Sequence, residues 1–318
     1  MAFPAYQALR AHFPDAHLSL LCTENVADLD FAETLHWDEK RVLSVEQRKF
    51  PSGLLSLAAD LRRERYDLAV SFPHSFSAAF LFQASGIPER IGFSGDWNRA
   101  FFTQSLRWRG PESGRHKSLL YRELIDLVTG NSSALNASHS EEKSGLENRK
   151  KEPSEPSYLV IAPGASLPLR EWPYTAELLM GLRKEYPHLR LRVVASPQEK
   201  KWSSLVGRLG DPAIEDWVGK TTLPSLITLC RGARLVIAND SGVAHLSASL
   251  AEAPTLVLFG PGNPTYVAPR GPQVRVARVE GLACSPCEKP YCRAPYGYQR
   301  CLRDLSLSQV LSEIRMLL

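Results

Sequence analysis

Residues 239–245 (NDSGVAH) bring a carboxylate, a hydroxyl, a glycine and an imidazole together in one short run. They follow the apolar stretch 233–239 (ARLVIAN) and precede a stretch with helical spacing. In an open parallel sheet, ligands bind beyond the carboxyl ends of the strands, and the N-terminus of a helix attracts anions. We therefore predict that the main-chain N–H groups of Ser241 and Gly242 bind a phosphate. An ordinary helix N-cap is the alternative interpretation of the same letters.

Two more glycine-containing turns follow apolar stretches in the same half of the chain. They are residues 162–166 (APGAS), after YLVI, and residues 260–264 (GPGNP), after TLVLF. Arg170 comes soon after the first turn, and its planar guanidinium suits a phosphate, although a solvated surface arginine is the alternative. Three such turns are typical of a nucleotide pocket. The sequence contains neither G-x-G-x-x-G nor a Walker motif, which argues against a dehydrogenase or a P-loop enzyme.

The elements that must position these residues alternate between short apolar runs and helical patterns. In the second half, strands are expected at 158–162, 191–195, 233–239 and 255–259, and helices at 175–186, 223–230 and 243–250. In the first half, strands are expected at 17–22, 67–71 and 89–93, and helices at 6–12, 54–65 and 75–83. Buried parallel strands with crossover helices produce this alternation. The sequence thus predicts an α/β protein with two Rossmann-like domains that face a cleft.

Residues 131–157 separate the two halves. This segment is rich in Ser, Glu and Lys and contains no Phe, Trp or Tyr. It cannot bury enough apolar surface to offset the entropy of ordering it, so we expect a disordered linker. The expected domains are residues 1–130 and 158–305, and an amphipathic helix follows at 306–318.

Composition excludes several classes of protein. Of the 318 residues, 44% are hydrophobic and 23% are charged, which is typical of a globular chain. The net charge is +4, and residues 151–318 carry +5, with 20 Lys and Arg against 15 Asp and Glu, which suits an anionic small ligand. The basic residues are too scattered for a nucleic-acid interface. No apolar run is long enough to span a membrane, and the first residues lack a secretory signal. We therefore expect a cytoplasmic protein.

Taken together, these motifs resemble one family. P-G-A-S…R-x-W-P (163–173), N-D-S-G-x-x-H (239–245) and F-G-P-x-x-P (259–264) are similar to the motifs of the ADP-heptose:lipopolysaccharide heptosyltransferases, glycosyltransferase family 9, and of the heptosyltransferase II type within it. The pattern P-A-x-x-A-L-R-x-x-F-P-D-A (4–16) extends the resemblance over nearly the whole chain. The resemblance implies a GT-B fold, with the acceptor bound by the N-terminal domain and the nucleotide sugar by the C-terminal one.

The resemblance also implies an activity and its site. The activity is an inverting, metal-independent transfer of heptose from ADP-heptose to the inner core of lipopolysaccharide, with peripheral contact to the inner membrane and no catalytic cofactor. Arg170 stands where the family often has a lysine that stabilises the leaving diphosphate, and Asp240 is the second implied catalytic residue. The donor-site positions that match the family are Ala165, Ser166, Arg170, Thr221, Asp240, Ser241, Gly242 and His245.

The family's general base is an aspartate in a Gly-Asp loop directly before the P-A-x-x-A-L helix. This sequence begins at Met1, inside that motif. We therefore expect that the first strand and the loop are missing and that transfer by the chain as it stands is impaired. Two other functions stay open for this reason: a transferase for a different nucleotide sugar or glycan, and a non-catalytic nucleotide-sugar-binding protein.

Acceptor contacts are expected from two residues of the first half. His74 follows the strand at 67–71, and Arg90 precedes the apolar residues IGF. The alternative for His74 is a turn residue that binds nothing, and the alternative for Arg90 is an arginine exposed to solvent.

Four cysteines lie in one segment rich in Pro and Tyr: Cys284, Cys287, Cys292 and Cys301. Their C-x2-C-x4-C-x8-C spacing is similar to that of four-thiolate metal sites, so a structural zinc is predicted. Reduced thiols are the main alternative, because a cytoplasmic setting disfavours disulfides.

Overall fold

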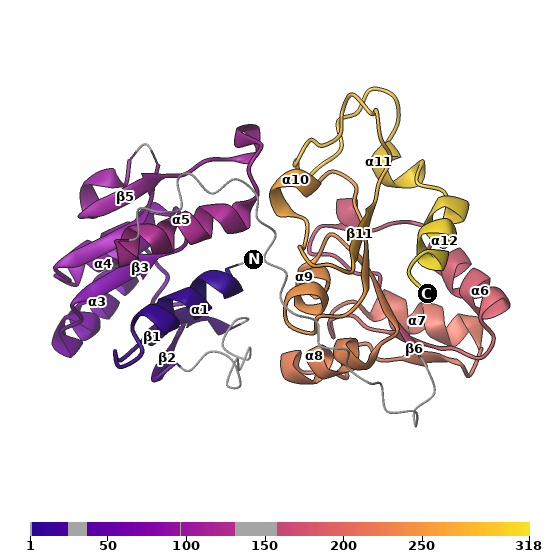
Figure 1. The fold of residues 1–318 in the computed structure, drawn as a ribbon, viewed down its shortest axis with the longest axis horizontal. Helices are drawn as coiled ribbons and strands as arrows, with labels where there is room; N and C mark the ends of the chain where they lie inside the picture. The colour runs from indigo at the N-terminus through magenta and orange to yellow at the C-terminus, as the bar shows by residue number, and fades with distance from the viewer. Residues whose placement is uncertain (1, 25–36, 96, 131–157) are drawn as a thin grey trace. The chain divides into compact units, whose positions relative to one another are not determined.

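The computed structural model describes residues 2–24, 37–95, 97–130 and 158–318 (Figure 1). The chain divides into two compact units, Met1–Ser144 and Gly145–Leu318. The predicted linker at 131–157 lies outside the described residues, as does most of the region between the first two strands.

The first unit contains two small parallel sheets. In one, β1 (Ser19–Thr23) pairs with β2 (Glu39–Leu43), and in the other the order is β3 (Leu68–Ser71), β4 (Glu89–Ser94) and β5 (Gln104–Arg107). Its helices are α1 (Phe3–His12), α3 (Ser52–Glu64), α4 (Phe76–Ala84) and α5 (Lys117–Thr129), with short 3-10 turns η1 (Arg99–Phe101) and η2 (Pro111–Ser113). The predicted elements of this half are confirmed, while β2, β5 and α5 were not predicted.

Apolar residues of the first unit form separate clusters against different helices. Leu57 and Leu61 of α3 meet Leu81 of α4, and Leu21 and Leu43 of the first sheet pack against them. A second cluster joins α1 and α5 through Ala5, Leu9 and Ile125. The period of three or four residues on α1 and α3 therefore reflects one buried helix face in each case.

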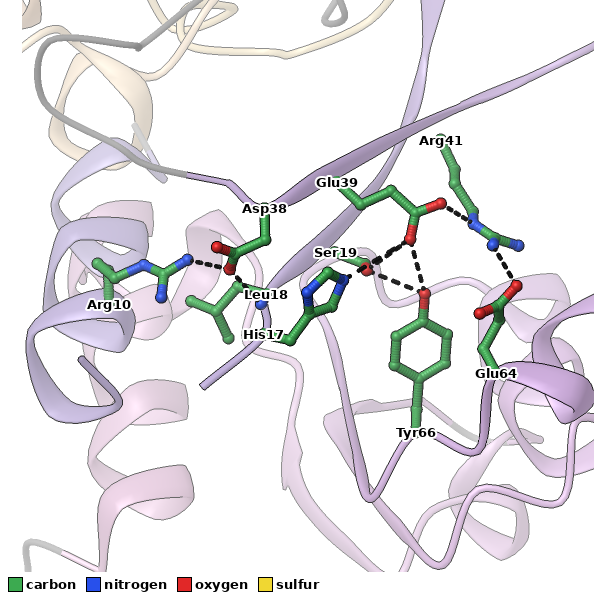
Figure 2. A network of polar contacts seen from close by, with 9 residues as sticks. All are labelled: Arg10, His17, Leu18, Ser19, Asp38, Glu39, Arg41, Glu64 and Tyr66. Carbon is green, nitrogen blue, oxygen red and sulfur yellow. Dashed lines mark hydrogen bonds and ion pairs between the residues drawn. The ribbon is translucent and has the colours of Figure 1, made fainter. Parts of the chain in front are cut away.

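Polar contacts fasten the β1–β2 sheet to helices α1 and α3 (Figure 2). Arg41 of β2 donates Nε to Glu39 at 2.7 Å and Nη2 to Glu64 of α3 at 2.7 Å. Hydrogen bonds, first of all from Arg41, hold the pKa of Glu39 below its usual value. At the other end, Arg10 of α1 donates to Asp38 at 2.6 Å. These contacts are structural, because each charged group is bonded to a neighbouring element.

The second unit is built on one parallel sheet of six strands. Their order is β11 (Val274–Ala277), β10 (Thr255–Leu258), β9 (Leu235–Asn239), β6 (Tyr158–Ala162), β7 (Arg190–Val193) and β8 (Ile214–Asp216). All residues of β6, β9 and β10 are buried. Strands that are buried on both faces have apolar residues at nearly every position. Such runs are visible in the sequence, and these three strands could therefore be predicted.

Helices cover both faces of this sheet. They are α6 (Thr175–Glu185), α7 (Lys200–Leu209), α8 (Leu223–Gly232), α9 (Gly242–Ser249), α10 (Pro264–Val267), α11 (Arg300–Arg303) and α12 (Leu307–Arg315), with the 3-10 turn η4 (Pro168–Arg170). Leu159 and Ile161 of β6 share a core cluster with α6, α7 and α12. Val160 and Ala162 share the opposite one with α8 and α9. The predicted doubly wound α/β arrangement is confirmed for this unit.

The C-terminal helix α12 belongs to the second unit. A capping box at Ser306 starts the helix, and Leu311 packs beside Gly181 of α6. Ion pairs from Arg315 to Glu185 and from Arg275 to Glu313 flank this contact. None of the helices in the described part of the chain is long and apolar enough to cross a membrane.

Candidate donor-binding site

The three glycine-containing turns lie at the same edge of the second sheet. Ala162 of β6 is in register with Ala238 of β9, and Leu258 of β10 is in register with Asn239. These strands are neighbours, so the residues that follow them emerge side by side. The register therefore brings together residues separated by more than ninety positions in the sequence, as the carboxyl edge of a parallel sheet does.

Arg170 and Asp240 form an ion pair at this edge. Arg170 Nη1 lies 3.1 Å from Asp240 Oδ2, and the Asp240 side chain is only 4% exposed, against 28% for Arg170. Burial raises the pKa of Asp240, and the nearby guanidinium lowers it in part. A carboxylate held in this way orients the arginine while leaving much of the guanidinium accessible.

Asn239 and Trp172 hold the turn that carries Arg170. The main-chain N–H of Trp172 donates to Asn239 Oδ1 at 3.2 Å, and Asn239 Nδ2 donates to the carbonyl of Pro163 at 2.6 Å. The Trp172 indole is 1% exposed and donates to the carbonyl of Leu305 at 2.8 Å. The Trp172 side chain is therefore part of the packed core and does not bind a ligand. Asn239, to which the sequence assigned no role, joins the turn after β6 to the turn that carries Arg170.

Two polar atoms at this edge, Arg170 Nε and Ser241 Oγ, are buried with no hydrogen-bond partner in the described part of the chain. Ser241 stands at the N-cap of α9, yet its side chain makes no capping hydrogen bond. Buried polar groups are almost always satisfied, so each exception needs a partner, and a bound ligand or a water molecule can supply it. The ordinary N-cap interpretation therefore does not describe Ser241.

Close packing surrounds two of the glycines. A Cβ on Gly262 would lie 2.5 Å from Asp240 Oδ2 and 3.1 Å from the Phe259 ring. A Cβ on Gly164 would collide with the carboxylate of Glu199. The turn at Gly262 needs glycine because the chain there approaches two buried side chains too closely for any other residue, whereas the end of the Glu199 side chain could move away from a Cβ at position 164.

The remaining predicted donor residues lie around this pair. Ala165 and Ser166 are in the turn after β6, and Ser166 is exposed. Gly242 begins α9, and His245 is half-buried one turn further along. Thr221 lies in the loop after β8, which is two strands away from β6 in the sheet.

The cysteine segment lies against the same turns. The N–H of Cys287 donates to the carbonyl of Pro261 at 3.0 Å, and Ser285 Oγ donates to that of Gly260 at 2.9 Å. Cys301 is 9% exposed, and burial followed by the proximity of the other three thiols raises its pKa to about 11. Within residues 2–24, 37–95, 97–130 and 158–318, no group of three or more His, Cys, Asp and Glu side chains is placed to hold a metal ion. The structural zinc stays a prediction.

His74 and Arg90, predicted to contact the acceptor, lie in different settings within the first unit. His74 stacks on Trp108 with ring centroids 4.3 Å apart, and burial and then the charge of Lys117 lower its pKa. Arg90 lies at the start of β4 and donates to three main-chain carbonyls, those of Ile87, Pro88 and Phe101. His74 thus stays accessible for an acceptor, whereas the contacts of Arg90 are those of a residue that fastens its own loop.

Comparisons with solved structures identify the fold of the chain. The computed structure superposes on that of the ADP-heptose lipopolysaccharide heptosyltransferase II of E. coli with a TM-score of 0.76 and 22% identity, covering 99% of this chain and 93% of the other. E. coli heptosyltransferase WaaC with ADP-2-deoxy-2-fluoro heptose gives a TM-score of 0.67 at 18% identity, with 99% and 94% covered. The chain therefore has the α/β architecture of the GT-B glycosyltransferases.

The sequence specifies the family within this fold. The profile of glycosyltransferase family 9 (heptosyltransferase) matches residues 54–296. Lipopolysaccharide heptosyltransferase 2 of Escherichia coli (strain K12) is 26% identical over 343 aligned positions, which cover all of this chain and 94% of the relative. The chain belongs to glycosyltransferase family 9, as its motifs indicated.

Proposed function

We propose that this glycosyltransferase moves a heptosyl group from ADP-heptose to the inner core of lipopolysaccharide, with inversion at the anomeric carbon and without a catalytic metal. Membership of the family supports the heptosyl donor. A relative of the same fold has been solved with ADP-2-deoxy-2-fluoro heptose. The observation that carries the proposal is the Arg170–Asp240 pair beside the uncapped N-terminus of α9.

Negative charge develops on ADP as the bond to the sugar breaks. Arg170 supplies a fixed positive charge there, and the N–H groups at Ser241 and Gly242 supply hydrogen bonds and the positive end of the helix dipole. These groups are already in place before the reaction, so little reorganisation is needed as charge builds up. They can stabilise the negative charge of the leaving diphosphate, as a divalent cation does in metal-dependent transferases.

Asp240 acts through Arg170 rather than as a proton acceptor. It is almost fully buried and paired with the guanidinium. We assign Ala165, Ser166 and His245 to contacts with the diphosphate and heptose, because they follow the neighbouring strands β6 and β9. We assign Thr221 to the adenosine end, because it follows β8, which is two strands further along the sheet from β6. No general base is assigned among these residues.

The first unit would bind the acceptor, and its aromatic surface suits a lipid-linked molecule. Phe50 and Phe76 are 58% and 43% exposed and contact each other edge-on, with centroids 6.0 Å apart. Exposed Arg48 precedes this aromatic pair. Aromatic rings beside basic side chains favour the interface of an anionic membrane. We therefore place the enzyme in the cytoplasm, in peripheral contact with the inner membrane.

Calorimetric titration with ADP and UDP tests the donor, and transfer assays with ADP-heptose and two core acceptors, one without heptose and one that already carries one heptose, test the reaction. We expect ADP to bind and UDP not to bind. Arg170→Ala should weaken ADP binding by about 10- to 100-fold while the protein stays folded. Equal binding of the two nucleotides would indicate another nucleotide-sugar donor. ADP binding without transfer, in a protein whose N-terminus has been verified, would indicate a non-catalytic binding protein.

A further inference from the structure

Gln299 has an unusual main-chain conformation for a residue with a side chain. Its φ of +56° lies in the left-handed region, and it is only 6% exposed at the start of α11. Residues other than glycine are uncommon there, and such strain persists when the surrounding structure holds it. Gln299 is therefore kept in place by its contacts.

The side-chain contacts of Gln299 surround Arg170. Its Nε2 donates to the carbonyl of Leu169 at 3.0 Å and to that of Glu171 at 2.9 Å. These carbonyls belong to the residues immediately before and after Arg170. A single buried amide therefore holds the peptide group directly before Arg170 and the peptide group that follows Glu171, one on each side of the arginine.

The main chain of Gln299 joins this turn to the cysteine segment. Its N–H donates to Cys292 Sγ at 3.2 Å. Earlier in the same segment, Cys287 and Ser285 are bonded to the third turn, at Pro261 and Gly260. The segment from 284 to 301 is thus fastened to the turn that carries Arg170 and to the glycine-containing turn at 260–264.

We propose that Gln299 is a positioning residue for donor binding, which holds the turn at residues 168–171 so that Arg170 reaches both Asp240 and the diphosphate. This inference rests on the proposed function, since it concerns the same donor site. It predicts that the amide of Gln299 acts on the donor only through Arg170. Leu169 and Glu171 take part through their carbonyls, so their side chains need not touch the donor.

Two substitutions withdraw the amide from the carbonyls of Leu169 and Glu171 without straining the chain. Gln299→Asn shortens the side chain by one methylene and tolerates a left-handed φ, and Gln299→Gly removes the side chain and relieves the strain. We expect each to weaken ADP binding about tenfold in calorimetric titration. Gln309→Asn is the matched control, because Gln309 also bonds to the main chain, in the capping box of α12. It should lower the melting temperature and leave ADP affinity unchanged.

A double-mutant cycle separates positioning from general loss of structure. In the Arg170→Ala background, Gln299→Asn should change ADP affinity less than twofold, because the group that it positions is gone. A similar loss of affinity in both backgrounds, or no loss in the wild-type background, would overturn the proposal.

A second readout does not depend on ADP. Carboxyl NMR of Asp240 should show a higher pKa in Gln299→Asn than in the wild type, because the guanidinium no longer lies beside it. An unchanged Asp240 titration would also overturn the proposal. If the wild type fails to bind ADP, the proposed function falls, and the Asp240 titration still decides whether Gln299 positions Arg170.

Discussion

The side chain of Asn239 accepts the main-chain N–H of Trp172 at 3.2 Å, across 67 positions of sequence. Its amide also donates to the carbonyl of Pro163 at 2.6 Å. Asn239 itself is 2% exposed. One buried amide at the end of β9 therefore sets the distance between the turn after β6 and the turn that carries Arg170.

Asn239→Ala should lower the free energy of unfolding by about 2–4 kcal/mol, because it leaves buried main-chain groups without partners. Urea denaturation measures this loss. Asn263→Ala is a suitable comparison, since it removes an N-cap at α10 and should cost only about 1 kcal/mol. Equal losses in the two variants would show that Asn239 is an ordinary capping residue.

Asp240→Asn should weaken ADP binding by about tenfold, because the neutral amide holds Arg170 less firmly. The same substitution should not weaken the folded protein, although it weakens ADP binding. Burial raises the pKa of Asp240 above the ordinary value of 3.8, so the folded protein binds more protons than the unfolded chain between these two pKa values. Stability from this group is therefore lost as pH rises through that window.

The Asn variant should lack this loss, and at pH 7 it should be as stable as the wild type or more so. Thermal denaturation from pH 4 to pH 8 measures the difference. A variant that is less stable at pH 7 would mean that the ion pair with Arg170 outweighs the burial of the carboxylate.

Gly262→Ala should reduce both stability and ADP affinity, because the added methyl group collides with the Asp240 carboxylate and the Phe259 ring. Gly207→Ala is its control. Gly207 lies in helix α7 with open space around its Cβ position, so alanine there should stabilise the protein by about 0.5–1 kcal/mol. Calorimetry with ADP and denaturation of both variants check the contrast, and unchanged ADP binding by Gly262→Ala would contradict it.

Thiol labelling at pH 8 should divide the cysteines into two groups. Burial raises the pKa of Cys230 to about 12 and that of Cys301 to about 11, so both should react slowly. The half-buried Cys284, Cys287 and Cys292 should react first. If the predicted zinc is present, these three will be protected until a chelator is added, and elemental analysis will find one zinc per chain. Rapid labelling without chelator, together with little zinc, would end the zinc hypothesis.

Replacing Phe50 and Phe76 together by serine should reduce binding to vesicles that contain anionic phospholipid, because the aromatic rings no longer insert at the interface. Vesicle flotation measures binding, with neutral vesicles as the reference. Met180→Ser removes an apolar side chain that is 52% exposed on α6, and it should leave binding unchanged. Equal flotation of the wild type and the double variant would contradict the membrane role of this surface.

The sequence by itself determined the four inner strands, β10, β9, β6 and β7, and the glycine-containing turns of the second unit. The runs at β6, β9 and β10 are apolar throughout because both faces of these strands are buried, and such runs are visible without any structure. The short strands β2, β8 and β11 were missed, because they are partly exposed at or near sheet edges and carry charged residues. Motif spacing also identified the family, because recognising a family requires only local residue patterns.

Only the tertiary structure decided which side chains meet. The ion pair of Arg170 with Asp240 and the bonds of Gln299 to the Arg170 turn join residues far apart in the chain. Such pairings depend on strand register and on the path of the connecting loops, and neither leaves a periodic signal in the sequence. The same reason explains why Arg90, a candidate for the acceptor by its type and position, proves to bind its own loop. Local patterns specify elements, whereas the packing of those elements specifies partners.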